Sequence, residues 1–340
     1  MKCFTQNKRH WTCTLKNDSM IFEFKTPSDK TKKIMSDVAS GKIENTHFKE
    51  ECENKICEIT NAEFSKITSS GNNSIFVALS SINGDIIIPD QGGWHGFKQI
   101  AKFLGKNIIT LKTDLGIINP KYMDNLEFND NSALIFTSFA GYSGEQDIKS
   151  ISKYARDNEI TLIEDASAGI GDKKKLLGNC SYSDIVIAST GQPKIINVGS
   201  GGFIATNDEN LFSETSLPLK LSKTNEIISS GIHEELKSVD KNLQITLNAT
   251  DYLKKHIPNT IHADKRGVNI IIKDDNAKQK TWQLKNQLPI NKSGFINKCP
   301  NYNRVKTKAI SIEIKNLNYN CLEKEYLNEI IKAVNNLQQA

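Results

Sequence analysis

The chain has 340 residues, of which 44 are Lys or Arg and 39 are Asp or Glu, so its formal net charge is +5. A chain of this length can form one large and one smaller domain, and its 38% hydrophobic and 24% charged residues are typical of globular proteins rather than disordered or fibrous ones. The small net charge argues against a nucleic-acid-binding surface. No apolar run approaches the roughly 20 residues of a membrane span. Residues 1–10 lack the apolar core of a signal peptide. We therefore expect a cytoplasmic protein with no membrane or nucleic-acid partner.

Short apolar runs alternate with helical periodicities through the middle of the chain. The runs predict strands at residues 85–89, 108–111, 133–137, 160–163, 185–188 and 203–206. The strand from residue 160 is expected to stop at two acids, Glu164 and Asp165. Apolar residues that recur at helical spacing predict helices around Phe48, Cys52 and Ile59, at residues 97–104 and at residues 148–155. Strands that alternate with helices in this way predict a mostly parallel sheet covered on both faces, an α/β fold.

Beyond about residue 235 the pattern changes to that of a smaller α+β unit. A helix is predicted near residues 242–256, strands at 268–273 and 309–314, and a final amphipathic helix at 322–334. We therefore expect three parts: an N-terminal segment at residues 1–60, a large α/β domain at 61–235 and a small α+β domain at 236–340.

The residues that directly follow the predicted strands indicate the chemistry, because ligands bind at the carboxyl ends of strands in such sheets. They include an aromatic residue, an acid, a lysine and Gly/Ser/Asn turns, at Ser69–Asn73, Trp94, Asp165, Ser189–Lys194 and Asn197–Gly202. Pyridoxal phosphate requires a lysine amine for a Schiff base and an acid at its pyridine nitrogen. Its phosphate suits backbone N–H groups at a helix start, and an aromatic ring can cover its flat face. The set therefore predicts a pyridoxal-phosphate site in the large domain.

The order and spacing of these residues resemble the DegT/DnrJ/EryC1/StrS sugar aminotransferase family, within the fold type I pyridoxal-phosphate enzymes. The similarity rests on Leu162-Ile-Glu-Asp-Ala166 and on Ser189-x4-Lys194-x4-Gly199-x-Gly201-Gly202. It implies that Lys194 forms the Schiff base and moves the proton, and that Asp165 contacts the pyridine nitrogen. It further implies phosphate contacts by Asn72, Asn73 and Ser189, and stacking by Trp94. The family forms homodimers and transfers an amino group to a keto-sugar, often nucleotide-linked, from a donor such as glutamate.

The sequence also departs from the family pattern. Ala168 stands where the family usually has a glutamine that contacts the cofactor, and the C-terminal part offers only Cys299-Pro-Asn-Tyr302 as a candidate for the substrate-binding loop. Two alternatives therefore stay open, a pyridoxal-phosphate lyase or desulfurase acting on an amino acid and a catalytically weak, regulatory cofactor-binding protein. No metal site is expected, because no histidine follows Cys52 and Cys57 at a ligand-like spacing.

Overall fold

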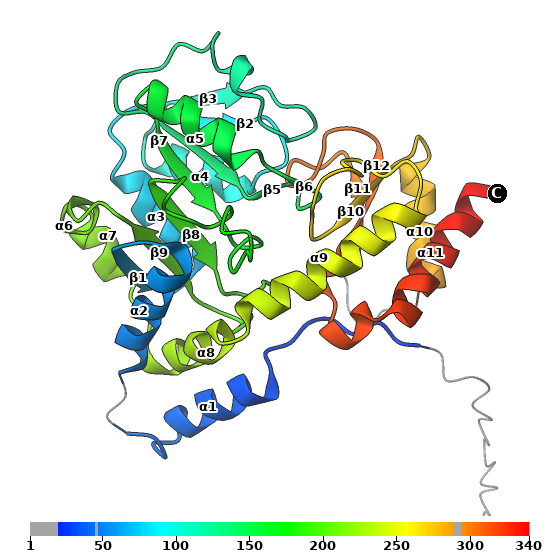
Figure 1. Cartoon of the computed structure of the whole chain (residues 1–340), viewed down its shortest axis with the longest axis horizontal. Coiled ribbons are helices and arrows are strands. Elements are labelled where there is room, and N and C mark those ends of the chain that lie inside the picture. The colour runs from blue at the N-terminus through cyan, green and yellow to red at the C-terminus, as the bar shows by residue number, and fades with distance from the viewer. Residues whose placement is uncertain (1–19, 45–46, 289–293, 340) are drawn as a thin grey trace, which may run out of the picture.

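The computed structural model describes residues 20–44, 47–288 and 294–339, so the features noted at residues 1–10 lie outside the described part. A large sheet with helices on both faces lies beside a smaller sheet, and one long helix runs between them (Figure 1). The N-terminal segment contributes the helices α1 (Asp29–Ala39) and α2 (Phe48–Thr60). Among the described helices, none has the length and apolar character needed to cross a membrane.

The large sheet has seven strands in the order β1-β9-β8-β7-β4-β2-β3. They are β1 (Phe64–Thr68), β2 (Ile86–Pro89), β3 (Ile108–Leu111), β4 (Ala133–Thr137), β7 (Thr161–Asp165), β8 (Ile185–Ser189) and β9 (Gly202–Thr206). In this sheet β9 runs antiparallel to β1 and β8, whereas the other pairings are parallel. A short pair, β5 (Phe139–Ala140) and β6 (Gly144–Glu145), follows β4 in the chain.

Helices cover both faces of this sheet. On one face α3 (Gly71–Ser80) and α4 (His95–Phe103) share a core with alternate strand residues such as Ile135. The opposite face buries Leu134 against α5 (Ile148–Asp157), and α2 and α8 (Glu226–Leu236) pack over β8 on that side. The predicted three-layer α/β/α architecture is therefore confirmed. Two short helices, α6 (Asn210–Glu214) and α7 (Ser216–Leu221), follow β9.

The C-terminal part forms an antiparallel sheet in the order β10-β12-β11, with helices packed on it. Its helices and strands are α9 (Val239–His256), β10 (Ile270–Lys273), α10 (Ala277–Gln287), β11 (Ile296–Cys299), β12 (Ala309–Ile312) and α11 (Lys324–Gln339). It also contains the 3-10 helices η2 (Ile314–Asn316) and η3 (Tyr319–Leu322), whereas η1 (Pro120–Tyr122) belongs to the large domain. This confirms the predicted smaller α+β domain. Phe22 of the N-terminal segment packs into its core, so that segment contacts the small domain before α1 reaches α8. The boundaries at residues 60 and 235 stay predictions.

The strand β7 differs from its prediction in a way that matters for the site. It continues through Glu164 and Asp165 instead of stopping at them. Glu164 is fully buried within the strand. Three groups donate to its carboxylate, namely Ser138 Oγ at 2.6 Å, Gly178 N at 2.9 Å and Ser183 Oγ at 3.1 Å. A buried acid with such partners is compatible with a strand interior, so the expectation that both acids end the strand was wrong.

Lys254 of α9 connects the small domain to a loop beside the large sheet through hydrogen bonds of its amine. Its buried amine donates to the carbonyl oxygens of Ser143, His262 and Lys265, each at 2.6 Å. Replacing Lys254 by methionine leaves three carbonyl groups without this donor, and each unsatisfied buried group costs about 1–3 kcal/mol. We expect the free energy of unfolding to fall by about 3 kcal/mol or more, measured by urea denaturation.

The matched control is Lys255→Met on the same helix. The side chain of Lys255 is 68% exposed and pairs with Asp251 at the surface, and exposed pairs contribute about 0–1 kcal/mol. Equal losses for both variants would contradict a structural role of the Lys254 amine.

Candidate active site

The candidate site lies where the carboxyl ends of β1, β7 and β8 meet the N-terminus of α3. Ser70 caps this helix, since its Oγ accepts from Asn73 N at 3.1 Å. The first N–H groups of a helix have no partner within it and attract anions. Gly71 allows the helix to start against β8, because a Cβ at this position would lie 2.5 Å from Ser189 Cβ. The backbone therefore presents a helix N-terminus at this edge of the sheet.

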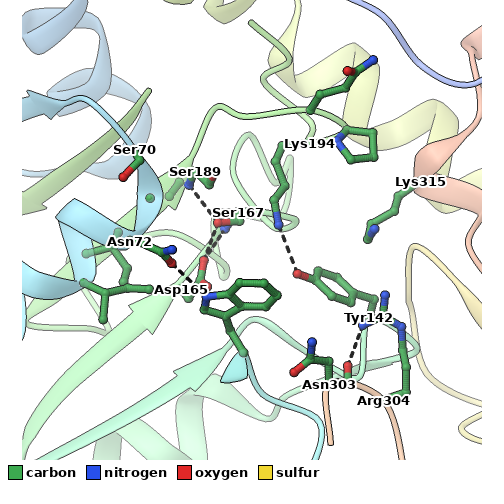
Figure 2. Close-up of a pocket in the computed structure, with 17 residues that line it drawn as sticks. Ser70, Asn72, Tyr142, Asp165, Ser167, Ser189, Lys194, Asn303, Arg304 and Lys315 are labelled. Carbon is green, nitrogen blue, oxygen red and sulfur yellow. Dashed lines mark hydrogen bonds between the residues drawn. The ribbon is translucent and has the colours of Figure 1, made fainter. Parts of the chain in front are cut away.

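A pocket of about 340 Å³ opens at this edge (Figure 2). It is lined by residues of both domains, namely Ser70, Gly71, Asn72, Ile75, Trp94, Tyr142, Asp165, Ser167, Ile187, Ala188, Ser189, Gln192, Pro193, Lys194, Asn303, Arg304 and Lys315. Its volume lies in the usual range of small-molecule sites. Five of the six predicted site residues line it, and Asn73 does not.

Lys194 reaches into the pocket from the loop after β8. Its Nζ donates to the hydroxyl of Tyr142 at 3.2 Å, as Figure 2 shows. Burial disfavours the charged amine, but Tyr142 and Asp165 outweigh that effect and hold the pKa of Lys194 above its ordinary value. Tyr142 itself has the unusual backbone angle φ 66°, a left-handed conformation that is uncommon outside glycine and often found at functional sites.

Asp165, the last residue of β7, presents a largely buried carboxylate at the floor of the pocket. Its Oδ1 accepts from Ser167 N at 3.0 Å and from Ser167 Oγ at 2.5 Å. Ser167 Oγ also accepts from Ser189 N at 2.8 Å, which links the ends of β7 and β8. These bonds fix the orientation of the carboxylate, and within the described residues none reaches its Oδ2.

Trp94 and Asn72 form the opposite wall. The indole Nε1 of Trp94 donates to Asn72 Oδ1 at 2.9 Å, and the tryptophan is 36% exposed, so its ring can still meet a ligand. Asn73 turns away, since its Nδ2 donates to Ser69 Oγ at 2.6 Å. A phosphate contact by Asn73 would therefore use its backbone or require its side chain to turn.

The residues that the sequence did not single out come from two sources. Ser70 lies within the turn Ser69–Asn73 and Ser167 directly follows Leu162–Ala166, where the sequence signal was present but not assigned to them. Tyr142 lies in the turn between β5 and β6. Ser167 lines the pocket, whereas its neighbour Ala168, at the expected glutamine position, is buried in a hydrophobic core.

The other source is the small domain. Asn303 and Arg304 directly follow the candidate loop Cys299–Tyr302, and Lys315 comes from η2. Their approach to the pocket depends on how the small domain packs, which no local pattern predicts. Among the described residues, no group of three or more His, Cys, Asp or Glu side chains is placed to hold a metal ion.

The buried Glu164 beside the site leads to a pH-dependent prediction. Burial raises the pKa of Glu164 to about 7, partly offset by its three hydrogen bonds. A carboxyl whose pKa is raised on folding contributes stability that is full below its unfolded pKa and is lost as pH rises through its folded pKa. We therefore expect the wild type to lose about 3 kcal/mol between about pH 4.5 and pH 7 relative to Glu164→Gln.

This glutamine is a close structural match. Its Oε1 can keep the bonds from Ser138 and Gly178, and its amide can donate to Ser183. Chemical denaturation of both proteins across this pH range measures the difference. A difference that does not change with pH would show that Glu164 is ionised throughout.

The chain is similar to known protein families in sequence and to known aminotransferase structures in fold. Residues 26–226 match the model of the DegT/DnrJ/EryC1/StrS aminotransferase family, and residues 240–335 match that of the MJ1341 family C-terminal domain. The fold is shared with an aminotransferase of Helicobacter pylori, PseC, involved in the biosynthesis of pseudaminic acid, with a TM-score of 0.73 at 15% identity over 93% of this chain and 98% of that one.

Two curated relatives are similar over part of their length. A GDP-perosamine synthase of Escherichia coli O157:H7 is 24% identical over 47% of this chain and 45% of its own, and a UDP-4-amino-4,6-dideoxy-N-acetyl-beta-L-altrosamine transaminase of Campylobacter jejuni is 27% identical over 49% and 46%. The match thus spans about half the length of each relative. Because the family model covers more than half of the chain, including the pocket residues from Ser70 to Lys194, this protein belongs to the DegT/DnrJ/EryC1/StrS aminotransferase family.

Proposed function

We propose that this protein is a pyridoxal-phosphate-dependent aminotransferase that transfers an amino group from glutamate or a similar donor to a nucleotide-linked keto-sugar. The observation that carries the proposal is that one pocket brings together the amine of Lys194, the carboxylate of Asp165 and the N-terminus of α3. The two curated relatives named above act on nucleotide sugars by their names, which supports the substrate class.

The residues of the pocket fit pyridoxal phosphate. The N-terminus of α3, with Ser70, Asn72 and the nearby Ser189, would hold the phosphate, and its glycine start leaves no side chain in the way. Asp165 would hold the proton on the pyridine nitrogen, and Trp94 would cover the ring. The cofactor, when bound, supplies the electron sink for amino transfer.

Lys194 has two tasks in this proposal. Its amine would hold the cofactor and would then move a proton at the reacting carbon, as a general base. The hydroxyl of Tyr142, 3.2 Å from Nζ, orients the amine and can relay its proton. In the first half of the reaction the donor amino acid leaves its amino group behind, and in the second the keto-sugar takes it up.

The test is to mix the cofactor-loaded protein with L-glutamate alone. We expect stoichiometric 2-oxoglutarate and conversion of the cofactor to pyridoxamine phosphate, followed by amination when a nucleotide-linked keto-sugar is added. Release of pyruvate or sulfide from an amino acid would instead identify a lyase or desulfurase. A loaded protein that reacts with no amine would favour a regulatory role.

We further propose that the protein works as a homodimer in the cytoplasm, as the family resemblance implies. Large apolar side chains exposed on α4 and α7, two helices that each contact α3, support an interface. Phe103 of α4 is 81% exposed, and Leu217 and Leu221 of α7 are 63% and 70% exposed. Sedimentation equilibrium is expected to give twice the chain mass of 38.0 kDa, whereas a monomer at micromolar concentration would contradict the dimer.

A further inference from the structure

The pocket lining carries an excess of positive charge, contributed by the loop after β8 and by the small domain. Among the charged side chains that line the pocket, Lys194, Arg304 and Lys315 are cationic and only Asp165 is anionic. Three of these groups surround one ring, since Lys194 Nζ, Arg304 Cζ and Lys315 Nζ lie 5.5, 4.6 and 4.6 Å from the ring centroid of Tyr142. Figure 2 shows Lys194 and Lys315 both extending toward this ring.

Arg304 already forms an ion pair with a buried carboxylate, that of Glu313. Its Nε donates to Glu313 Oε1 at 2.7 Å and its second terminal nitrogen to Glu313 Oε2 at 2.5 Å, a two-point ion pair with a fully buried carboxylate. Its other terminal nitrogen donates to the carbonyl of Asn303. Arg304 and Glu313 therefore neutralise each other.

Lys315 has fewer hydrogen-bond and ion-pair partner atoms among the described residues than Arg304 has. Its Nζ donates to Asn316 Oδ1 at 2.6 Å and lies 3.5 Å from Glu313 Oε2, although Arg304 already occupies that carboxylate. Lys315 is 5% exposed, and an ammonium can donate three hydrogen bonds. One buried cation thus faces the pocket without a carboxylate of its own.

A second buried amine nearby adds to the excess charge. Lys25 of the N-terminal segment is 1% exposed, and its Nζ has no hydrogen-bond partner within the described residues. It lies over the ring of Tyr319, and its carbonyl accepts from the pocket residue Gln192. Excess buried cations are costly unless an anion joins them.

We propose that Lys315, held beside the Arg304–Glu313 pair, binds the carboxylate of an acidic substrate next to the amine of Lys194. This inference rests on the proposed function and identifies the group that recognises its amino donor. A carboxylate fits better than a nucleotide diphosphate, because the carboxylate of an amino acid is one bond from the reacting carbon and both lysines border the same tyrosine ring. The cofactor phosphate belongs at the N-terminus of α3.

Proton linkage gives the site a distinctive signature. Burial lowers the pKa of Lys315 to about 7, with Arg304, Lys194 and Lys25 also lowering it and Glu313 opposing them. The carboxylate therefore binds the protonated form and draws a proton into the site. Affinity is expected to fall as pH rises from 6 to 8, by up to about tenfold.

The experiment measures binding of glutarate, a dicarboxylate with no amino group to transfer, by calorimetry on the full chain with pyridoxal phosphate added. Lys315→Met is expected to weaken glutarate binding by about 10- to 100-fold, the usual value of a charge-assisted hydrogen bond. Lys315→Arg keeps the positive charge at all pH values, so it should retain binding and lose its dependence on pH. The control Lys308→Met, at an exposed position on the same segment, should bind as the wild type does.

The wild type alone supplies an independent arm if a variant does not fold. In two buffers of different ionisation enthalpy, glutarate binding near pH 8 should take up close to one proton, and the absence of detectable glutarate binding would overturn the proposal. Unchanged glutarate affinity in folded Lys315→Met would also overturn it. So would a Lys315→Met variant that loses affinity only for UDP, used as a nucleotide diphosphate probe, or only for the cofactor. Because glutarate binding does not require a covalent cofactor, failure of the proposed enzyme function would show separately, as absence of an adduct at Lys194.

Discussion

Lys194→Ala is expected to lower kcat for amino transfer from glutamate by roughly 10³-fold or more, because in the proposed mechanism one amine would both hold the cofactor and move the proton. The protein should stay folded, since within the described residues Lys194 Nζ makes a single hydrogen bond, to Tyr142, and its burial carries a desolvation cost. Steady-state kinetics with glutamate, together with a thermal melt, measure both effects.

Two further variants separate the amine from its charge. Lys194→Arg keeps a cation, but a guanidinium does not lose its proton in proteins, so this variant is expected to be as inactive as the alanine variant. Lys173→Ala, on an exposed loop where the lysine lies 3.8 Å from Asp240, should keep full activity. Retention of more than a tenth of the wild-type kcat by Lys194→Ala would contradict the assigned role.

Glu313→Gln is expected to cause a large loss of stability. Glu313 is fully buried and is the carboxylate to which both Arg304 and Lys315 turn, with further hydrogen bonds from Ser311 and Asn269. Removing its charge leaves buried cations without a counterion, which costs about 3–5 kcal/mol. Urea denaturation at pH 7 measures this loss, and Glu325→Gln, at an exposed position of α11, should change stability by less than about 0.5 kcal/mol.

The loss should also depend on pH in a defined direction. Despite burial, Arg304 and Lys315 lower the pKa of Glu313 to about 2. A carboxyl whose pKa is depressed on folding contributes stability that is present above its unfolded value, near 4.5, and is lost as pH falls toward 2. The difference between wild type and Glu313→Gln should therefore shrink below pH 4.5. A difference that stays constant down to pH 3 would argue that packing, rather than charge, is what the variant removes.

Local patterns predicted most of the large domain, because each of its buried parallel strands is a short apolar run between turn residues. β1 escaped prediction because Phe64–Thr68 has only two apolar residues, separated by Ser65 and Lys66, and because it is an edge strand that pairs with β9 in the described sheet. The end of β7 was misplaced for a different reason. The donors that make Glu164 acceptable inside a strand, Ser138 and Ser183, are distant in sequence.

The site shows the same division between local and long-range information. Asp165 ends β7 and Lys194 follows the adjacent strand β8, so their approach could be inferred from chain order alone. Arg304 and Lys315 follow the strands of another sheet, and only the packing of the small domain brings them to Tyr142. The pocket residues from the small domain were therefore not assigned from sequence patterns, whereas most of those from the large domain were.

Reductive trapping tests the central claim most directly. The cofactor-loaded wild type would be treated with borohydride, digested and mapped by mass spectrometry. The account predicts one phosphopyridoxyl group, on the peptide that contains Lys194, and none there in Lys194→Ala. Attachment to the other buried pocket amine, Lys315, or no attachment at all, would contradict it.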